Sequence, residues 1–441
     1  MNRLRLLSDS LRSSLWFLPT LLVLSAVVLA ISLVAAEPWF DGNNFEEKWP
    51  RLLGAGAAGS RGMLSAIAGS IITVTGVGFS VMIVALTLAS SQYTPRILRN
   101  FMSDEGNQAV LGVFLGVYAY CLVVLRTIRG GDEGAFVPSF AVLVGVVLAF
   151  VAIGFFIFFI HHISSALQAS SIIEAAARET IVAIDRLFPS ALGAAAPPHL
   201  ESELPSSVVA WRTVSAQNTG YVQSVDADAL LHLARDWDLV IRMEVGIGEF
   251  VVEGAPLVSI TGKTAAVDEP GLALNDAYSI GRHRTTFQDV GFGVRQLVDI
   301  ALKGLSPGIN DTTTALICVD YLTAILSRLA QRQIETPFRM HEGQLRVIAR
   351  GPSFRSLLDE AFNQIRQNAG GNVVVLVRLL AVLHIIAGFT HDEERRRALQ
   401  HHTDLLVETA ERSVSSPHDR AAIQSVSQQA MPTSRQVWGK P

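Results

Sequence analysis

The stretch that decides the fold runs from Arg61 to Arg96 and reads RGMLSAIAGSIITVTGVGFSVMIVALTLASSQYTPR. It contains no charged side chain between its two terminal arginines, and it is long enough to cross a bilayer as a single helix. Small and hydroxyl-bearing residues recur in it every three or four positions, which places them on one face of that helix. These residues are Gly62, Ala66, Gly69, Thr73, Gly76, Ser80, Thr87 and Ser91.

The opposite face of this helix is predicted to be bulky, with Leu64, Ile71 and Phe79 among its members. A helix with one bulky face and one small, polar face turns the small face toward something other than lipid. That partner is either a neighbouring helix or water. The sequence alone leaves both alternatives open, and the choice between them decides what the protein does.

The inner exit of this helix is expected just after its last apolar turn. The residue before a proline disfavours helical geometry, so the helix should stop near Pro95. Arginine side chains at such a boundary can extend toward lipid headgroups. The exit is therefore assigned to Gln92, Pro95, Arg96 and Arg99.

Four apolar runs, at about residues 15–36, 62–91, 108–125 and 137–160, have the length that a transmembrane helix needs. We therefore predict a four-helix transmembrane domain over residues 1–163. Arginines precede the first run and acidic residues follow it, which favours a cytoplasmic N terminus. Four crossings return the chain to the cytoplasm, so the C terminus is expected there too. The expected partner of the four spans is the lipid bilayer.

The remainder of the chain is predicted to be a cytoplasmic α+β region. An amphipathic helix should connect it to the membrane over residues 164–189, and a linker rich in alanine, proline and serine follows at 190–207. Alternating apolar residues predict a small β module at 208–264. Within it, the G-x-F-V-x-x-G-x-P-L pattern that begins at Gly248 resembles the turn and strand of barrel-sandwich folds.

Helical patterns dominate residues 271–411, which we predict to form a mainly helical domain. Within it, residues 273–281 and 373–411 are each expected to form helix, and residues 345–349 a short strand. The polar tail at 412–441 is expected to be disordered. The predicted fold class is therefore an α-helical membrane protein whose four transmembrane helices are followed by a cytoplasmic α+β region.

Several segments carry a resemblance to a known family. Residues 288–301 read QDVGFGVRQLVDIA, residues 305–311 read LSPGIND, and residues 13–19 and 89–96 read SSLWFLP and ASSQYTPR. Together they resemble an uncharacterised bacterial family of predicted membrane proteins, known as domain of unknown function 2254. The resemblance extends to about residue 411 and implies a multi-span protein of the bacterial plasma (inner) membrane. Its signature positions in the cytoplasmic region are Gln288, Asp289, Arg295, Asp299, Pro307, Asn310 and Asp311.

The resemblance implies no activity, and the residues themselves argue against an enzyme. No Ser/His/Asp or Cys/His arrangement stands out, and no cysteine–histidine cluster indicates zinc. The Gly-Lys-Thr sequence at 262–264 lacks the first glycine of a phosphate-binding loop, because Leu257 occupies that position. A net charge of −4 does not favour nucleic acid as a partner. We therefore expect no catalytic residue, no cofactor and no metal.

Two classes of function remain. The first is a homo-oligomeric channel or pore with the second transmembrane helix at its axis, the cytoplasmic domain as vestibule or sensor, and an ion or small solute as permeant. The second is a non-conducting structural or regulatory protein, in which the small residues only pack helices together. A transporter is less favoured, because no carboxylate is expected within the four spans.

Overall fold

The computed structural model describes residues 16–41, 56–92, 104–130, 136–166, 168–188, 211–262, 269–332, 334 and 337–429. The chain divides into two compact units, residues 1–171 and residues 172–441, which are called unit 1 and unit 2. Part of the expected inner exit (Pro95, Arg96 and Arg99) and the expected linker at 190–207 lie outside the described residues.

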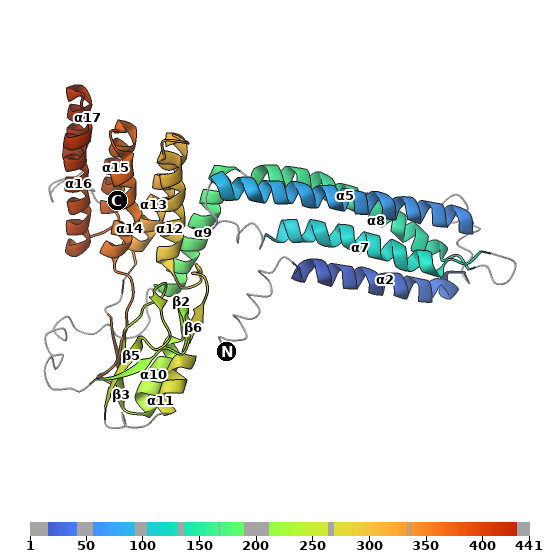
Figure 1. Ribbon diagram of the computed structural model, residues 1–441, viewed down its shortest axis with the longest axis horizontal. Coiled ribbons are helices and arrows are strands. Elements are labelled where there is room, and N and C mark those ends of the chain that lie inside the picture. Colours follow the sequence, from blue (N-terminus) through green and yellow to red (C-terminus); the bar gives the residue numbers. More distant parts are fainter. Residues whose placement is uncertain are drawn as a thin grey trace, which may run out of the picture. The chain divides into compact units, whose positions relative to one another are not determined.

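Unit 1 contains four long apolar helices that run side by side (Figure 1). They are α2 (Phe17–Asp41), α5 (Ala57–Gln92), α7 (Glu105–Thr127) and α8 (Ser139–Ala166). Each corresponds to one of the predicted apolar runs, and each is several residues longer than predicted. Helix α7 packs against the other three and carries many of the buried side chains, including Phe114, Tyr120 and Cys121.

By length and composition, five described helices could cross a membrane, so these criteria alone do not give the number four. The fifth is α13 (Thr312–Ala330), which belongs to unit 2. It carries two charged residues in ion pairs, Asp320 with Arg378 at 2.6 Å and Arg328 with Asp185 at 2.8 Å. Charges of this kind are costly in hydrocarbon, and they are the reason to separate α13 from the helices of unit 1.

Most of α9 (Ala169–Leu187) belongs to unit 2, which continues with two β-sheets. The larger sheet has the order β1 (Arg212–Ser215), β5 (Pro256–Gly262), β3 (Leu239–Met243), β8 (Gln344–Ile348) and β7 (Phe338–His341). The smaller sheet has the order β4 (Phe250–Val251), β2 (Gly220–Val225) and β6 (Tyr278–Gly281). Two helices accompany the strands, α10 (Ala227–Asp236) and α11 (Glu269–Asp276).

The core of the larger sheet follows from the alternation of residues along β3. Leu239, Ile241 and Met243 are buried, while the residues between them are partly exposed. Ile241 pairs with Ile260 of β5 on one side and with Val347 of β8 on the other. The β3–β8 pairing is parallel and brings together segments about 100 residues apart in sequence.

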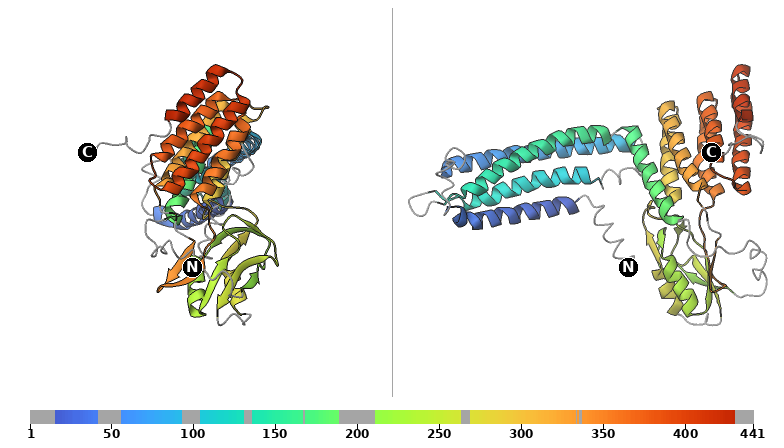
Figure 2. Two further views of the ribbon diagram at one scale, coloured as in Figure 1. Left: turned by 90° about the vertical axis from the view of Figure 1, so that its left-hand side faces the viewer. Right: turned by 180° about the vertical axis from the view of Figure 1, so that it is seen from behind.

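The rest of unit 2 is a set of helices packed side by side, seen from two further directions in Figure 2. Besides α13, they are α12 (Val290–Leu305), α14 (Phe354–Ala369), α15 (Val373–Ala387), α16 (Glu393–Ser413) and α17 (Pro417–Gln429). Polar side chains cap several of them at the N terminus, among them Asp289, Asp311 and Ser353.

The structure corrects three expectations for this region. The helix expected at 273–281 stops at Asp276, because Tyr278–Gly281 pairs with β2 as β6. The helix expected at 373–411 is broken into α15 and α16, with Asp392 capping the second. Residues 417–429, expected to be disordered, form α17, whereas 430–441 lie outside the described residues.

The extent of the β region is also wider than predicted. Strands β7 and β8 come from residues 338–348, which were expected to belong to the mainly helical domain. They join the same sheet as β1, β3 and β5, so the β region is not confined to 208–264. The resemblance to a barrel sandwich stays a prediction.

Candidate functional site

The small residues of α5 lie on the face that points away from the other helices of unit 1. Gly62, Gly69 and Gly76 are exposed, and no described atom outside the local backbone comes within 4 Å of a β-carbon built at any of them. The other members of this face, called the small face below, are exposed as well: Ala66, Thr73, Ser80 and Thr87. Ser91 and Gln92 are the last two residues of α5.

The face that α5 uses within the chain lies on the other side of the helix. Leu64, Ile71, Thr75 and Met82 are buried there. At 100° per residue, the centre of this packing face lies roughly opposite the centre of the small face. Among the described residues, the packing of unit 1 therefore does not use the small face.

The predicted bulky face is corrected in detail. Leu64 and Ile71 do pack in the bundle, but Phe79 and Ile72 are exposed and lie on the flanks of α5. Two valines also project on the side of the small face, Val77 with 56% and Val84 with 58% of their surface exposed. The exposed surface of α5 is therefore small and polar along its centre and apolar along its edges.

The hydroxyl groups of the small face are satisfied by their own helix. Thr73 donates to the carbonyl oxygen of Gly69 at 2.8 Å, Ser80 to that of Gly76 at 3.0 Å, and Thr87 to that of Ile83 at 2.8 Å. Each hydroxyl still has acceptor capacity. The face can therefore meet either an apolar neighbour or water without leaving a donor unpaired.

Unit 1 also contains a buried carboxylate that sequence reasoning placed outside the membrane helices. Glu37 lies within α2, is the last residue of the first candidate span, and is 2% exposed. Its Oε1 accepts a hydrogen bond from the N–H of Phe140 at 3.2 Å, at the start of α8. The expectation that the spans hold no carboxylate is thus wrong for this end of α2. The interaction with a helix N terminus gives Glu37 a capping role.

A second polar pair joins α7 to the end of α8. His162 Nε2 lies 2.7 Å from Asp104 Oδ1, and the same oxygen accepts the N–H of Asn107 at 2.9 Å to cap α7. The imidazole ring stacks on Phe158 with centroids 5.2 Å apart. His162 therefore acts within a helix cap.

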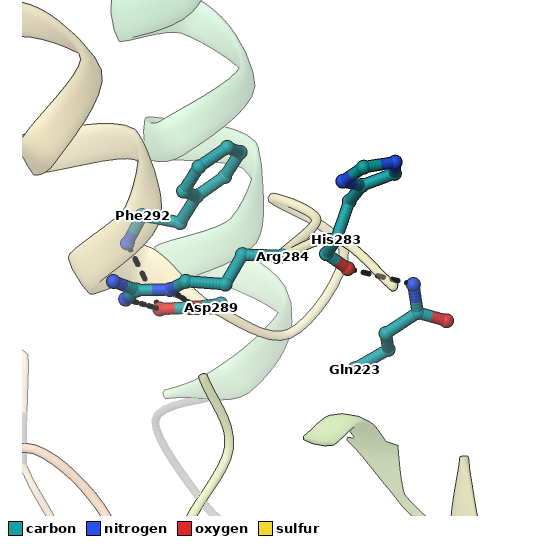
Figure 3. A network of polar contacts seen from close by, with 5 residues as sticks. All are labelled: Gln223, His283, Arg284, Asp289 and Phe292. Atoms are coloured by element: carbon teal, nitrogen blue, oxygen red, sulfur yellow. Dashed lines mark hydrogen bonds and ion pairs between the residues drawn. The ribbon is translucent and has the colours of Figure 1, made fainter. Parts of the chain in front are cut away.

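The first two family-signature residues, Gln288 and Asp289, lie where β2 meets the start of α12. The side-chain amide of Gln288 contacts the backbone of Val225 at the end of β2, accepting its N–H at 2.9 Å. Asp289 is 6% exposed, caps α12 by accepting the N–H of Phe292 at 2.9 Å, and forms an ion pair with Arg284 (Figure 3). Gly248 has a positive φ of 82°, and a β-carbon there would collide with the Asp289 carboxylate.

Two other signature pairs stabilise the helices themselves. Arg295 binds Asp299 one turn along α12 at 2.8 Å and reaches Glu360 of α14 at 3.5 Å. The Asp311 carboxylate caps α13, accepting the N–H and the hydroxyl of Thr314 at 3.0 and 2.6 Å. The Thr314 hydroxyl lowers the pKa of Asp311, with help from the backbone N–H groups of this helix start.

The turn before α13 explains the Ser-Pro-Gly-Ile-Asn-Asp sequence. Asn310 has a φ of 49°, a conformation that asparagine tolerates better than most residues. The N–H of Asp311 then donates to the carbonyl oxygen of Gly304 at 2.7 Å, which closes the loop that contains Pro307. The signature therefore serves caps, turns and helix contacts, and its residues do not converge as a set of catalytic groups.

One contact set in unit 2 was not found from the sequence. Asp185 of α9 accepts hydrogen bonds from Arg328 at 2.8 and 3.0 Å and from Arg332 at 2.5 Å. The Arg328 hydrogen bond is the main cause of the lowered pKa of Asp185. The sequence shows only an acidic residue in one predicted helix and two arginines about 145 residues later. Such a combination is too common to predict a contact.

Within the described ranges, no group of three or more histidine, cysteine, aspartate or glutamate side chains is placed to hold a metal ion. The two cysteines, Cys121 and Cys318, are both buried and unpaired with each other. Two features of the chain therefore stand out as candidate functional sites: the small face of α5 and the signature segment of unit 2.

Comparison with known proteins gives the family. A family model described as a predicted membrane protein of unknown function (domain of unknown function 2254) matches residues 12–384. Uncharacterised proteins of Mycobacterium bovis and Mycobacterium tuberculosis are each 33% identical over 434 residues, covering 96% of this chain and 81% of the relative. No solved structure matches. The chain therefore belongs to this family of predicted membrane proteins, and its apolar helices agree with a multi-pass membrane protein.

Proposed function

We propose that the protein is a homo-oligomeric pore of the bacterial plasma membrane, in which α5 of each copy lines the axis. The observation that carries this proposal is the position of the small face, exposed and opposite the side on which α5 packs in its own chain. Four membrane helices are too few to enclose a pore, so the proposal requires several copies. Unit 2 would be cytoplasmic, with both chain termini on that side, and would act as vestibule or sensor.

The spacing along the small face supports contact between copies. Gly62, Gly69 and Gly76 are seven residues apart, and so are Ala66, Thr73, Ser80 and Thr87. A seven-residue repeat favours left-handed packing of helices at a shallow angle. Glycine permits close approach of backbones. Where the helices separate, the hydroxyl groups of Thr73, Ser80 and Thr87 can accept hydrogen bonds from water in a lumen.

A non-conducting assembly is the second candidate, and Val77 and Val84 favour it. Both valines are exposed beside the small face, where they would help to exclude water from a contact between copies. In that arrangement the small face is a helix-packing interface, and the protein has a structural or regulatory role without catalysis. The two candidates share the oligomer and differ in whether water reaches α5.

Recording from purified protein in planar bilayers tests the proposal, with wild type compared with Gly76→Leu and Gly154→Leu. Gly154 is a matched control, because it is an exposed glycine of α8 that also has no described neighbour within 4 Å of a built β-carbon. A pore predicts currents that Gly76→Leu reduces and Gly154→Leu leaves unchanged. A silent wild type under voltage, tension and ligand screens, with a particle of monomer size, would exclude both pore and oligomer.

A further inference from the structure

Six helices of unit 2 form three hairpins that stack in two layers. The hairpins are α12–α13, α14–α15 and α16–α17, and each helix also packs against its counterpart in the next hairpin. Within one layer, Asn372 donates to the Thr312 hydroxyl at 3.0 Å near the starts of α15 and α13. Arg378 binds Asp320 further along both helices, so α13 and α15 run parallel.

The outer surface of α15 is apolar. Val374, Ile385 and Phe389, just beyond its end, expose 44–59% of their surface. In the other layer, by contrast, every exposed residue of α14 and of α16 is polar. The outward positions of α15 are spaced four, three and four residues apart, which is the spacing of a seam between two packed helices. They are Val374, Arg378, Ala381 and Ile385.

Helix α13 presents a second seam with the same spacing beside the first. Its outward positions are Thr313, Ile317, Asp320 and Ala324, of which the first and last are exposed and the other two half-buried. These four residues and the four of α15 are called the α13–α15 face. At its centre, Arg378 and Asp320 lie 2.6 Å apart, and each side chain keeps 43% of its surface exposed. The face therefore carries one positive and one negative charge among apolar and small residues.

We propose that the α13–α15 face binds the same face of a second copy of this chain. A two-fold axis parallel to the helices would place α15 of each copy on α13 of the other. Arg378 of one copy would then lie beside Asp320 of the other, twice in each contact. A two-fold axis across the helices would instead set Arg378 against Arg378, and like charges repel. The charges thus select the first arrangement.

The size of the face agrees with a contact between membrane-anchored copies. A helix of 19 residues is about 28 Å long, and two helices about 10 Å apart give a face of roughly 550 Å². Two such faces bury about 1,100 Å², at the lower end for specific contacts. Anchoring in one bilayer raises the effective concentration of the copies and supports a contact of this size. A membrane surface fits the face less well, because anionic lipid attracts clusters of basic residues and here the charges balance.

Cysteine cross-linking in native membranes tests the contact. Two otherwise cysteine-free chains with different tags carry Ala381→Cys or Ala324→Cys. Ala381 follows Arg378 by three residues and Ala324 follows Asp320 by four, so the proposed pairing brings them to nearly the same level along the helices. Oxidation should join the two chains about tenfold more than it joins either to a chain with Gln367→Cys, because a disulfide needs close α-carbons. Gln367 is exposed on α14, in the other layer. Cross-linking at the Gln367→Cys level would overturn the proposal.

Charge variants in the same two chains give the second measurement. Arg378→Asp or Asp320→Arg in both chains puts two like charges on every face, so cross-linking should fall about tenfold. With Arg378→Asp in one chain and Asp320→Arg in the other, opposite charges meet again and cross-linking should return to the wild-type level. That recovery would also show that both variants fold. A loss without recovery in the mixture would contradict the proposed pairing.

This contact shares with the proposed pore only the presence of several copies in one membrane. Gly76→Leu should reduce the current and leave the cross-link between positions 381 and 324 in place. Cross-linked protein that carries no current would count against the pore alone. Currents without the cross-link would count against the contact alone.

Discussion

Arg284 holds the Asp289 carboxylate through two hydrogen bonds, Nε to Oδ2 at 2.7 Å and Nη2 to Oδ1 at 2.9 Å. The same carboxylate caps α12 and lies against Gly248 of the turn before β4. One side chain therefore joins a helix start, a loop and a β-turn, at the centre of the family signature.

Asp289→Ala should destabilise unit 2 by about 3 kcal/mol, because it leaves the Arg284 charge unpaired and removes a helix cap. Asp289→Asn should cost less, since asparagine is also a good N-cap. Pulse proteolysis of the full chain in urea measures the change in midpoint. Glu408→Ala, in an exposed pair, should stay within about 0.5 kcal/mol of wild type. Equal losses for Asp289→Ala and Glu408→Ala would refute the role of this ion pair.

Gly293→Val should displace α9 from α12, because the new side chain would occupy the position of the Thr180 hydroxyl. Overpacking of this kind costs about 2 kcal/mol or more. Gly308→Ala is the control, since a β-carbon there meets no described atom within 4 Å. The melting temperature of each variant can be measured by heating the protein and assaying the protease resistance of residues 172–441 at each temperature. Similar melting temperatures for the two variants would show that the close contact is not required.

Mild acid should destabilise unit 2 through His402. This residue is 1% exposed, lies 2.8 Å from Asp359, and also faces His401 and Arg366. Burial lowers the pKa of His402, and the Asp359 hydrogen bond opposes that shift only in part. As pH falls through about 6.5, the unfolded chain takes up a proton that the folded chain resists, so stability decreases.

His402→Gln tests this assignment, because glutamine can bond to Asp359 and does not titrate. Its stability should change less between pH 7 and pH 5 than that of wild type, and each tenfold lowering of the proton affinity of His402 in the folded chain corresponds to at most about 1.4 kcal/mol of that difference. The urea midpoint at each pH gives the slope. If the stability of wild type and of His402→Gln fell equally with pH, a group other than His402 would cause the acid sensitivity.

Water access to the small face can be measured with single cysteines at Thr73, Ser80 and Thr87 in otherwise cysteine-free protein. A pore predicts that a membrane-impermeant thiol reagent labels all three. Two controls lie on the same helix: Thr75, whose hydroxyl is buried in the bundle, and Phe79, which is exposed on a flank of α5. Protection of Thr73, Ser80 and Thr87 to the level of Thr75 would favour the dry interface.

The apolar helices of unit 1 could be located from sequence because hydropathy is a local property. Their lengths were underestimated, since polar residues such as Glu37 extend α2 beyond its apolar run. Long-range pairing accounts for the other errors. Tyr278–Gly281 resembles a continuing helix until β2 pairs with it, and the β7–β8 hairpin joins a sheet whose other three strands lie far away in sequence.

The candidate site was predictable to a similar degree. Periodicity placed Gly62 to Thr87 on one face, which the helix confirms, but it could not tell which side packs within the chain. Capping by Asp311 and pairing of Arg295 with Asp299 depend on residues within four positions, so contacts of this kind follow from local spacing. The Asp185 and Arg284 pairs were missed or unassigned because they depend on loops and tertiary packing.

The two opposite faces of α5 have an evolutionary consequence. In the proposed assembly, substitutions at Gly69 or Gly76 would alter how many copies assemble, or how tightly, while Leu64 and Ile71 continue to hold the single chain together. The number of copies and the folding of the single chain would then be selected independently. Relatives of this protein could diverge in quaternary arrangement while retaining the same tertiary structure.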